Sequence, residues 1–577
     1  MTDFKRFFLY AAVVAVVFML WNSWQHERSL QQPTTRTVTT TIGASASPTS
    51  LAQTSSTQTG DFVPSLAPPP QTDSTAAAVS HDSVTASSPS QQLITVTTDV
   101  FEVTIDKQGG SIVKVALLDY LQEAHDQQTP FVLLNDQPTT RYVAQSGLII
   151  PGDDSAEPRL FHSRQNQYQL QANDQVLEVM LTSEQQGIQV QKIYTFKPGD
   201  YLIQLTYQIA NARNQPWRGS LYTQLTRTEP QEKSSGFLTI ASFSGASLSN
   251  PDEKMYQKIS FKKLRSQNVN QVVTGGWAAM QQHYFLSAFI PPESQISQYY
   301  SNHNAQNGEY TIGLVGPEVQ IAPGQQQTLR SSLFVGPEIT PLLKDIAPGL
   351  DLTVDYGWLW PISVFLMWLM RQVHYVVGNW GWSIIIVTGL IKLAFYYPSA
   401  KSYRSMAHMR ELQPRMKMLK ERYADDKAKF SQAMMELYRK EKVNPLGGCL
   451  PILIQLPVFI ALYWVLLESV EFRHAPFMFW IQDLSAKDPY FILPVLMGIS
   501  MFIQQKLNPP PPDPMQEKIL LFLPIALTFL FVQFPAGLVL YWTVNNVLSI
   551  AQQWYVMQRF KQHKENTEKK LKIKKTN

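Results

Sequence analysis

The residues most able to do chemistry are polar side chains that lie inside strongly apolar segments. Lys392 lies within the apolar run from Ser383 to Pro398. A cation in such a run costs at least a few kcal/mol unless it faces water or a partner. Lys392 is six residues from Pro398, roughly 9 Å along a helix, so in one interpretation its ammonium snorkels to the nearby membrane surface. In the other interpretation it lines a water-filled cavity, with Thr388 on the same helix face one turn earlier.

Side-chain amides in other apolar segments favour the cavity. These amides are Gln455, Gln533, Asn545 and Asn546. Each of them alone is typical of a hydrogen bond between two helices. Together with Lys392 they predict a polar cavity among helices. The acid Glu468 stands only at the outer end of its segment, and a proton relay normally uses buried carboxylates. This counts against a proton-coupled transporter.

Other kinds of chemistry find little support in the sequence. Cys449 is the single cysteine, which excludes an intrachain disulfide and a multi-cysteine metal site. His162, His283 and His303 have no ligand spacing, and no phosphate-binding loop, zinc-protease motif or nucleophile elbow is present. We therefore expect no catalytic residues, no metal and no cofactor.

Composition points to a membrane protein with more than one unit. The chain has 577 residues, too many for one compact core. Charged residues make up 16%, against about 25% in an average soluble chain. Apolar residues make up 44%, which excludes wholesale disorder. The net charge of +4 is too small to indicate nucleic-acid binding by itself.

The first 92 residues predict an anchor and a tether. Lys5 and Arg6 precede the apolar run from Phe7 to Trp21. A cleavable signal peptide is the alternative, but no small-residue cleavage site follows closely. We therefore predict a transmembrane anchor over residues 1–25. Residues 26–92 are rich in Ser, Thr, Pro, Gln and Ala, which predicts a flexible periplasmic tether.

Residues 93–345 predict an all-β domain. Ile94–Ile105 is β-branched and roughly alternating, and Ile188–Phe196 and Tyr201–Ile209 alternate on either side of a Lys-Pro-Gly-Asp turn. That pattern predicts a β-hairpin, and similar short strands recur to about Val335 without a convincing helical stretch of any length. A β-sandwich is expected, with a binding or spacer role in preference to catalysis.

Charge then orients the apolar segments that follow. Residues 399–446 hold 12 Lys or Arg against 6 Asp or Glu, and residues 559–577 hold 8 against 2. Basic flanks stay in the cytosol, so the loop and the tail are predicted inside and the β domain outside. An amphipathic helix over residues 346–380 is expected to lie on the outer surface. The further spans are predicted at 381–398, 450–467, 490–504, 519–533 and 538–555, with a turn at residues 534–537.

Six spans with both termini in the cytosol result from this assignment. Two of them, 490–504 and 519–533, have only 15 residues. Such a helix covers roughly 22 Å, against about 30 Å of hydrocarbon. Either these short spans thin the bilayer, or the boundaries read from the sequence are wrong by a few residues.

The sequence of the predicted cytosolic loop, residues 399–446, predicts a helical hairpin. Its arms are Ser402–Tyr423, kinked at Pro414, and Lys427–Lys442. Methionine-rich surfaces accept varied apolar partners, so contact with a client protein is one role for the loop's methionines. Packing of the two arms against each other is the alternative. The residues assigned to client contact are Met409, Met416, Met434 and Met435. The basic tail suits anionic phospholipids or ribosomal RNA, or it acts only as a solvated topology signal.

Several motifs resemble the YidC membrane-protein insertases of Gram-negative bacteria. The similar stretches are Val354–Trp360, Asn379–Ile386, Glu441–Pro457, Phe477–Tyr490 and Phe534–Tyr541. The resemblance covers residues 350–560 strongly and the part before them more loosely. It implies an inner-membrane protein with five core spans around a hydrophilic groove, and an outer β-super-sandwich.

The resemblance also implies a function and partners. Such proteins insert membrane proteins and help them fold, alone or beside the Sec translocon. The ribosome and the signal-recognition-particle receptor are candidate partners for the hairpin and the tail, and DNA is not expected. The groove residues would be Lys392, Thr388, Gln455, Trp542 and Asn545. Lys392 stands where the family typically has arginine, and Trp542 stands where relatives often have tyrosine.

The expected mechanism is solvation of a client's polar flank in the groove, while its apolar segment slides along lipid-facing side chains. Hydrophobic partitioning would drive insertion, so no nucleotide site is needed. A small-anion transporter or channel that uses the Lys392 cavity is the alternative, although no inverted repeats or paired charges are visible. An intramembrane or envelope enzyme is a third class, and it lacks a visible nucleophile–base pair.

Overall fold

The computed structural model describes residues 92–576 except 125, 127, 153–158, 231–242, 424–425, 442, 444–449 and 511–513. The predicted anchor, almost all of the tether, and Cys449 lie outside the described residues. Internal contacts divide the chain into two units. The described part of the smaller unit is Leu419–Leu437, and the larger unit holds the other described residues.

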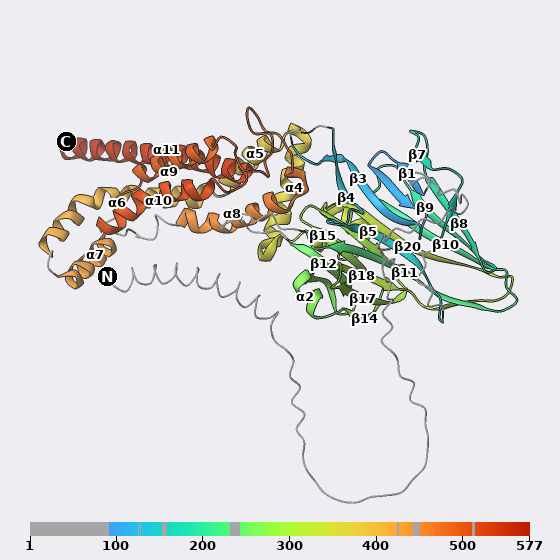
Figure 1. Cartoon of the computed structure of the whole chain (residues 1–577). Helices are drawn as coiled ribbons and strands as arrows, with labels where there is room; N and C mark the ends of the chain where they lie inside the picture. The colour runs from blue at the N-terminus through green and yellow to red at the C-terminus, as the bar shows by residue number, and fades with distance from the viewer. Residues whose placement is uncertain are drawn as a thin grey trace, which may run out of the picture. The chain divides into compact units, whose positions relative to one another are not determined.

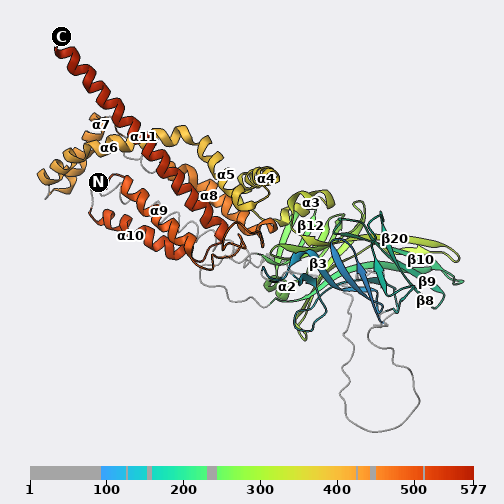
Figure 2. The same ribbon diagram turned by 90° about the horizontal axis from the view of Figure 1, so that it is seen from above.

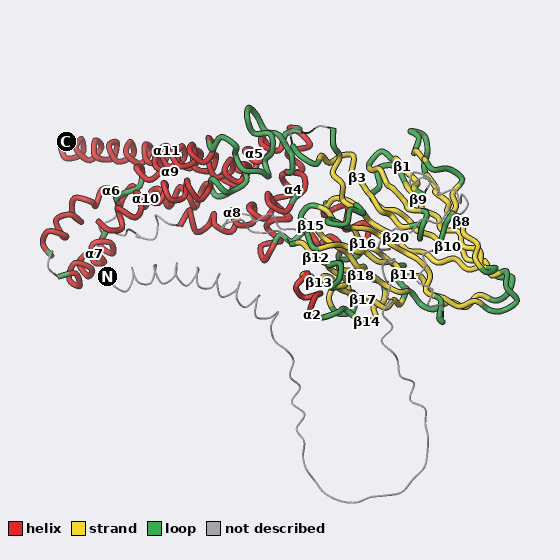
Figure 3. Tube along the Cα trace, in the orientation of Figure 1, coloured by secondary structure: helices red, strands yellow, loops and turns green. Residues whose placement is uncertain are grey.

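Strands dominate the described residues up to Pro337, and helices dominate those after it (Figures 1 and 3). Eleven strands form one sheet, in the order β14-β17-β18-β11-β5-β3-β2-β1-β7, with β19 paired to β11 and β4 paired to β3. Their bounds are β1 Leu93–Thr97, β2 Phe101–Asp106, β3 Ser111–Leu121, β4 Pro130–Leu134, β5 Tyr142–Ile149, β7 Gln167–Gln169, β11 Trp217–Thr228, β14 Asn270–Thr274, β17 Ile296–Asn304, β18 Glu309–Val315 and β19 Val319–Ile321.

A second sheet has nine strands in the order β13-β12-β15-β16-β20-β10-β9-β8-β6. Their bounds are β6 His162–Ser163, β8 Leu177–Gln185, β9 Ile188–Phe196, β10 Leu202–Asn211, β12 Ser244–Asn250, β13 Lys254–Ser260, β15 Trp277–Gln282, β16 Phe285–Ile290 and β20 Gln326–Pro337. The predicted hairpin is confirmed, because β9 and β10 pair antiparallel along their length. Two short helices, α2 (Phe261–Ser266) and α3 (Thr340–Ile346), add to the strands.

Alternation of side chains builds the core between the two sheets. In β10 the residues Ile203, Leu205, Tyr207 and Ile209 are buried, while those between them are more exposed. Period-two burial is what a strand with one face on a core produces. Residues from both sheets join one apolar core cluster, so the β-rich domain expected from the sequence is confirmed.

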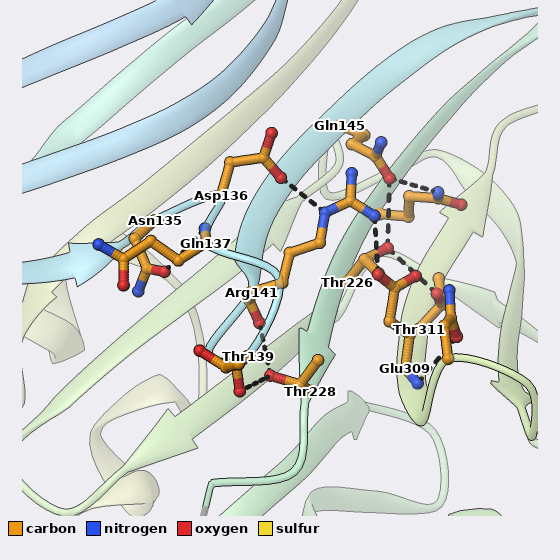
Figure 4. Close-up of polar contacts among 12 residues, drawn as sticks. Asn135, Asp136, Gln137, Thr139, Arg141, Gln145, Thr226, Thr228, Glu309 and Thr311 are labelled. Carbon is orange, nitrogen blue, oxygen red and sulfur yellow. Dashed lines mark hydrogen bonds and ion pairs between the residues drawn. The ribbon is translucent and has the colours of Figure 1, made fainter. Parts of the chain in front are cut away.

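Polar side chains also cross from strand to strand on the larger sheet (Figure 4). Arg141, just before β5, forms ion pairs with Asp136 at 2.6 Å and with Glu309 of β18 at 2.8 Å. On the neighbouring rows, the hydroxyls of Thr226 and Thr311 lie 3.1 Å apart. These pairs satisfy each other's hydrogen bonds and fix the register of β5, β11 and β18.

One lysine is buried inside the β domain without an acidic partner among the described residues. Lys192 on β9 is fully buried, and its Nζ donates to the carbonyl oxygens of Gly109 at 3.1 Å and Ser146 at 3.2 Å. The rings of Tyr194 and Tyr207 lie 5.3 and 5.4 Å from the same nitrogen. Backbone carbonyls and aromatic faces therefore replace the water that the amine loses.

Among the described residues, eight longer helices follow the β domain. They are α4 Trp360–Val377, α5 Trp380–Ala394, α6 Tyr396–Arg422, α7 Lys427–Lys440, α8 Leu450–Glu468, α9 Ile492–Leu507, α10 Pro514–Phe531 and α11 Ala536–Thr576. Short 3₁₀ turns lie at Leu350–Thr353, Gly357–Leu359 and Val470–Phe472. α11 runs as one continuous helix through the predicted last span and the basic tail (Figure 2). The break between α10 and α11 covers residues 532–535 and so overlaps only the first half of the turn predicted at 534–537, because α11 already begins at Ala536.

Local chemistry explains where the helices break. Gly378 ends α4 in the left-handed region, with φ of 68°, which glycine adopts without steric cost. Asn379 then caps α5, because its side chain accepts from the backbone N–H of Trp382 at 3.1 Å. α5 and α6 are bent by 68° relative to each other. Pro398 lies in the first turn of α6, where its missing N–H costs nothing.

Among the described helices, none taken singly combines the length and the hydropathy required to cross a membrane. The bent pair formed by α5 and α6 meets the criterion when its two helices are taken together.

The β domain meets the helical region at the C-terminal end of α8. His283, in the turn between β15 and β16, lies with Nε2 3.0 Å from the carbonyl oxygen of Leu467. Burial lowers the pKa of His283 to about 4. Arg473, beyond α8, donates to the carbonyl oxygen of Leu121 at 2.7 Å. The tip of the β15–β16 hairpin is therefore a point of attachment between the two parts of the larger unit.

Close packing of α9 on α10 depends on a glycine. A Cβ on Gly498 would lie 2.1 Å from Oγ1 of Thr528, whereas a Cβ on Gly389 would have no heavy atom of the described residues within 4 Å. We expect Gly498→Ala to lower the free energy of unfolding by about 1–3 kcal/mol, because α9 and α10 must separate. Gly389→Ala should be neutral or stabilising by up to ~1 kcal/mol, since alanine favours a helix. Thermal unfolding of the two variants in detergent checks this, and equal midpoints would contradict it.

The buried lysine predicts a dependence of stability on pH. Burial lowers the pKa of Lys192 well below its ordinary 10.5. Between the lowered value and 10.5, the unfolded chain binds a proton that the folded chain does not, so Lys192 makes the free energy of unfolding rise with pH. We expect the midpoint of wild type minus that of Lys192→Met to grow from about pH 7 to about pH 10. Calorimetry of the β-domain transition in the full chain measures this difference, and parallel pH profiles for the two proteins would argue against it.

Candidate functional site

Three helices bring polar side chains together around Lys392. The Nζ of Lys392, on α5, donates to Oγ of Ser549 on α11 at 2.7 Å and to Oε1 of Gln455 on α8 at 3.2 Å. The side chain of Lys392 is only partly buried. A cation that belongs to an apolar helix is therefore held by two uncharged acceptors from two other helices.

The amide of Gln455 is oriented by its own hydrogen bonds. Its Nε2 donates to the hydroxyl of Tyr541 at 3.2 Å and also contacts Oδ1 of Asn545. Because both partners take the amide nitrogen, the amide oxygen is left to face Lys392. We call Lys392, Gln455, Tyr541, Asn545 and Ser549 the Lys392 network.

Spacing along α11 places three of these residues on one face. Tyr541, Asn545 and Ser549 follow each other at intervals of four residues, and side chains four apart lie above one another on a helix. The hydroxyl of Ser549 donates to the carbonyl oxygen of Asn545 at 2.6 Å. Lys392 lies in the last turn of α5, where the helix dipole favours a cation.

The structure brings Lys392, Gln455 and Asn545 together, and it gives Thr388 a different partner. The Thr388 hydroxyl donates to the carbonyl oxygen of Ile384 in its own helix at 2.6 Å. Thr388 is 1% exposed, and no contact among the described residues joins it to Lys392. Its position in a client-binding groove stays a prediction.

Trp542 lies outside the network although it follows Tyr541 directly. Its ring contacts Phe459 at 4.5 Å in an edge-to-face arrangement and Phe531 at 5.2 Å. Successive residues of a helix are about 100° apart, which turns Trp542 toward this aromatic cluster of α8 and α10. Its Nε1 is buried without a hydrogen-bond partner among the described residues.

The remaining polar residues hold other parts of the helical region. Asn546 donates to Oγ of Ser500 on α9 at 3.0 Å. Gln533, after α10, accepts from Nζ of Lys487 at 2.5 Å. These two contacts agree with the simpler interpretation, in which such a side chain only forms a hydrogen bond between helices or loops.

Backbone pairing joins the turn between α10 and α11 to the loop before α9. The backbone N–H of Ala536 donates to the carbonyl oxygen of Ala486 at 2.7 Å, and that of Gly537 donates to Leu484 at 2.9 Å. Lys487 and Pro535 form an isolated antiparallel bridge beside them. The turn before α11 is thereby held against this loop by main-chain hydrogen bonds, which do not depend on side-chain identity.

The four methionines assigned to client contact differ in exposure. Met416 and Met434 are buried, at 7% and 2% exposed, whereas Met435 is 49% exposed. Met409 is intermediate. Met435 therefore has the accessibility that client contact needs, and the client-contact role of the four methionines stays a prediction.

Ser549 is a member of the network that the sequence did not single out. Serines are common in helices and usually bond the carbonyl four residues earlier, so Ser549 carries no signal by itself. The sequence feature that predicts the position of Ser549 is its spacing of four residues from Asn545. This spacing places both residues on the face of α11 that also carries Tyr541.

Comparison with known proteins gives consistent matches over most of the chain. The family model described as YidC periplasmic domain matches residues 93–369, and the one described as 60Kd inner membrane protein matches residues 372–565. The protein named membrane protein insertase YidC of Legionella pneumophila (strain Paris) is 48% identical over 567 residues, which cover 97% of this chain and 98% of the relative. The protein of the same name from Coxiella burnetii (strain Dugway 5J108-111) is 46% identical over 570 residues, with 97% and 98% covered.

A solved structure of an active YidC insertase, with its first transmembrane domain resolved, also matches. It is 19% identical in sequence and has a TM-score of 0.37. The match covers 80% of this chain and 92% of that one.

Two adjacent asparagines should stabilise different helix pairs. Asn545 contacts Gln455 on α8, and Asn546 contacts Ser500 on α9. We expect Asn545→Ala to increase amide hydrogen exchange in α8 and Asn546→Ala to increase it in α9, each at a cost of roughly 0.5–2 kcal/mol. Mass spectrometry of the deuterated full chain in nanodiscs separates the two helices. Identical exchange patterns in the two variants would show that these bonds do not act pairwise.

Proposed function

The chain belongs to the YidC family of membrane protein insertases, and from this premise we propose that the Lys392 network is the centre of its client-binding groove. The family is one of inner-membrane proteins with a periplasmic domain, and insertion of nascent membrane proteins is the function of this chain. The observation that carries the proposal is the ammonium of Lys392, held by Ser549 and Gln455 between three helices.

Apolar side chains cover the outside of the helical region, which supports several crossings of the membrane. On α10, Phe522 and Phe529 are 64% and 75% exposed, and on α9 Ile499 is 52% exposed. Apolar patches of this extent would be unfavourable in water and suit a lipid environment. We propose six spans with both termini in the cytosol, and the first of them lies outside the described residues.

The proposed position of α4 is along the outer membrane surface. One face of α4, with Leu366, Met367 and Met370, is buried, while Phe365 and Trp368 on another face are more than half exposed. Partition of such an apolar face into the interface would hold the helix flat. The pairing of the α10–α11 turn with the loop before α9 would close the groove on the same outer side.

In the proposed mechanism, the polar flank of a client enters the groove from the cytosol. Lys392, Gln455 and Asn545 would replace part of the water that the flank loses. α9 has 16 residues, or roughly 24 Å of helix, against about 30 Å of hydrocarbon. A locally thinned bilayer would shorten the path, and burial of the client's apolar segment in lipid would drive the reaction.

Partners beyond nascent membrane proteins follow from charge. The basic end of α11 and the basic loop suit anionic phospholipids and ribosomal RNA, because phosphate contacts need positive charge more than a defined shape. We propose the ribosome, the signal-recognition-particle receptor and the Sec translocon as partners, and no DNA. We propose no enzymatic step and no cofactor, which agrees with the insertase name of the relatives.

The decisive test is insertion of a small client with an acidic exported flank into liposomes that contain the purified chain. We expect Lys392→Arg to insert within about twofold of wild type, because the positive potential is kept. Lys392→Ser and Lys392→Glu should lose about tenfold, equivalent to ~1.4 kcal/mol. Protease protection of the flank measures insertion. Equal insertion by all four proteins would remove Lys392 from the mechanism.

Flux of radiolabelled anions in the same liposomes is the control for the alternative class. Anion transport without any insertion would favour a transporter and contradict the proposed function.

A further inference from the structure

The two residues that accept from Lys392, Ser549 and Gln455, donate their own hydrogens to other groups. The Ser549 hydroxyl proton goes to the carbonyl oxygen of Asn545 at 2.6 Å. The Gln455 amide nitrogen goes to Tyr541 and Asn545. A serine hydroxyl has one proton, so only lone pairs of Ser549 remain to face Lys392.

The site is therefore polarised toward a group that only donates. An ammonium is such a group, with three N–H donors and no acceptor. Ser549 and Gln455 occupy two of the three donors. No contact among the described residues uses the third, which leaves it for an acceptor that enters from outside, such as a client carboxylate.

Without Ser549, the ammonium of Lys392 can move toward the C-terminal end of α5. Its flexible four-carbon stem allows large movements of the ammonium. α5 ends at Ala394, two residues beyond Lys392, and the negative end of a helix dipole attracts a cation. Gln455 alone, at the longer distance of 3.2 Å, is a weaker restraint than the pair.

We propose that Ser549 is a positioning residue that holds the ammonium of Lys392 in the groove and thereby sets a preference for clients with acidic flanks. The proposal rests on the proposed function, and it assigns to Ser549 a role that neither its residue type nor the motifs of the chain indicate. Ser549 contacts no client in this view and acts only through Lys392.

The test compares two hydroxyl deletions on the same helix. Ser549→Ala removes one of the two acceptors of Lys392. Thr543→Val is the matched control, because Thr543 makes the same bond to the carbonyl four residues earlier, at 2.7 Å, and has no contact with Lys392 among the described residues. Each protein is assayed with a client that has an acidic exported flank and with a twin whose acids are replaced by amides.

We expect Ser549→Ala to lower the acidic-to-neutral insertion ratio by about tenfold, the equivalent of ~1.4 kcal/mol for a hydrogen bond to a charged group. The neutral twin should stay within about twofold of wild type, and Thr543→Val should change neither client. An unchanged ratio, or an equal fall for both clients, would overturn the positioning role. A wild-type chain that inserts neither client above empty liposomes would instead overturn the proposed function.

A second measurement does not depend on insertion. A membrane-impermeant amine reagent is added from the cytosolic side, and the modified peptides are quantified by mass spectrometry. Lys392 should be labelled about tenfold more in Ser549→Ala, because its ammonium moves toward the helix end, while Lys506 on α9 serves as the internal reference. Unchanged labelling of Lys392, or an equal rise at Lys506, would contradict the proposal.

Discussion

The cost of taking a positive charge out of water governs the arrangement of the helical region. Lys392 belongs to a helix whose other residues are largely apolar, so its ammonium needs hydrogen-bond acceptors from other helices. Ser549 and Gln455 supply them, and each comes from a different helix. α5, α8 and α11 therefore meet at one charge, and the relative positions of the three helices follow from satisfying it.

The same physical problem has a different solution in the β domain. Lys192 is fully buried and uses the backbone carbonyls of Gly109 and Ser146. Lys192 is 0% exposed and is therefore closed to a ligand, whereas Lys392 is only partly buried and its acceptors are side chains. Lys192 therefore serves only the structure of the β domain, whereas the ammonium of Lys392 is accessible to an acceptor that enters from outside.

Much of this organisation could be predicted from the sequence, because the relevant signals are local or periodic. The hairpin of Ile188–Phe196 with the following strand appears at the predicted place, and Lys392, Gln455 and Asn545 stand out as polar residues in apolar runs. The span predicted at 381–398 ends at Pro398, whereas α5 ends at Ala394 and Pro398 lies in the first turn of α6. Proline is tolerated at either place, so its presence alone cannot distinguish them. The spacing of four residues places Ser549 on the face of Asn545, but its contact with Lys392 and the contacts of Trp542 depend on how α11 packs against α5, α8 and α10, which no local pattern gives.

α11 is one helix of 41 residues, roughly 60 Å long, and it carries both the network serine and a basic terminal stretch. Lys564 near that end bonds Glu411 of α6 at 2.9 Å. No break in the helix separates these two features, because the backbone hydrogen bonds of α11 continue from one to the other. Tyr541, Asn545 and Ser549 are therefore parts of the same rigid element as the basic end of the chain.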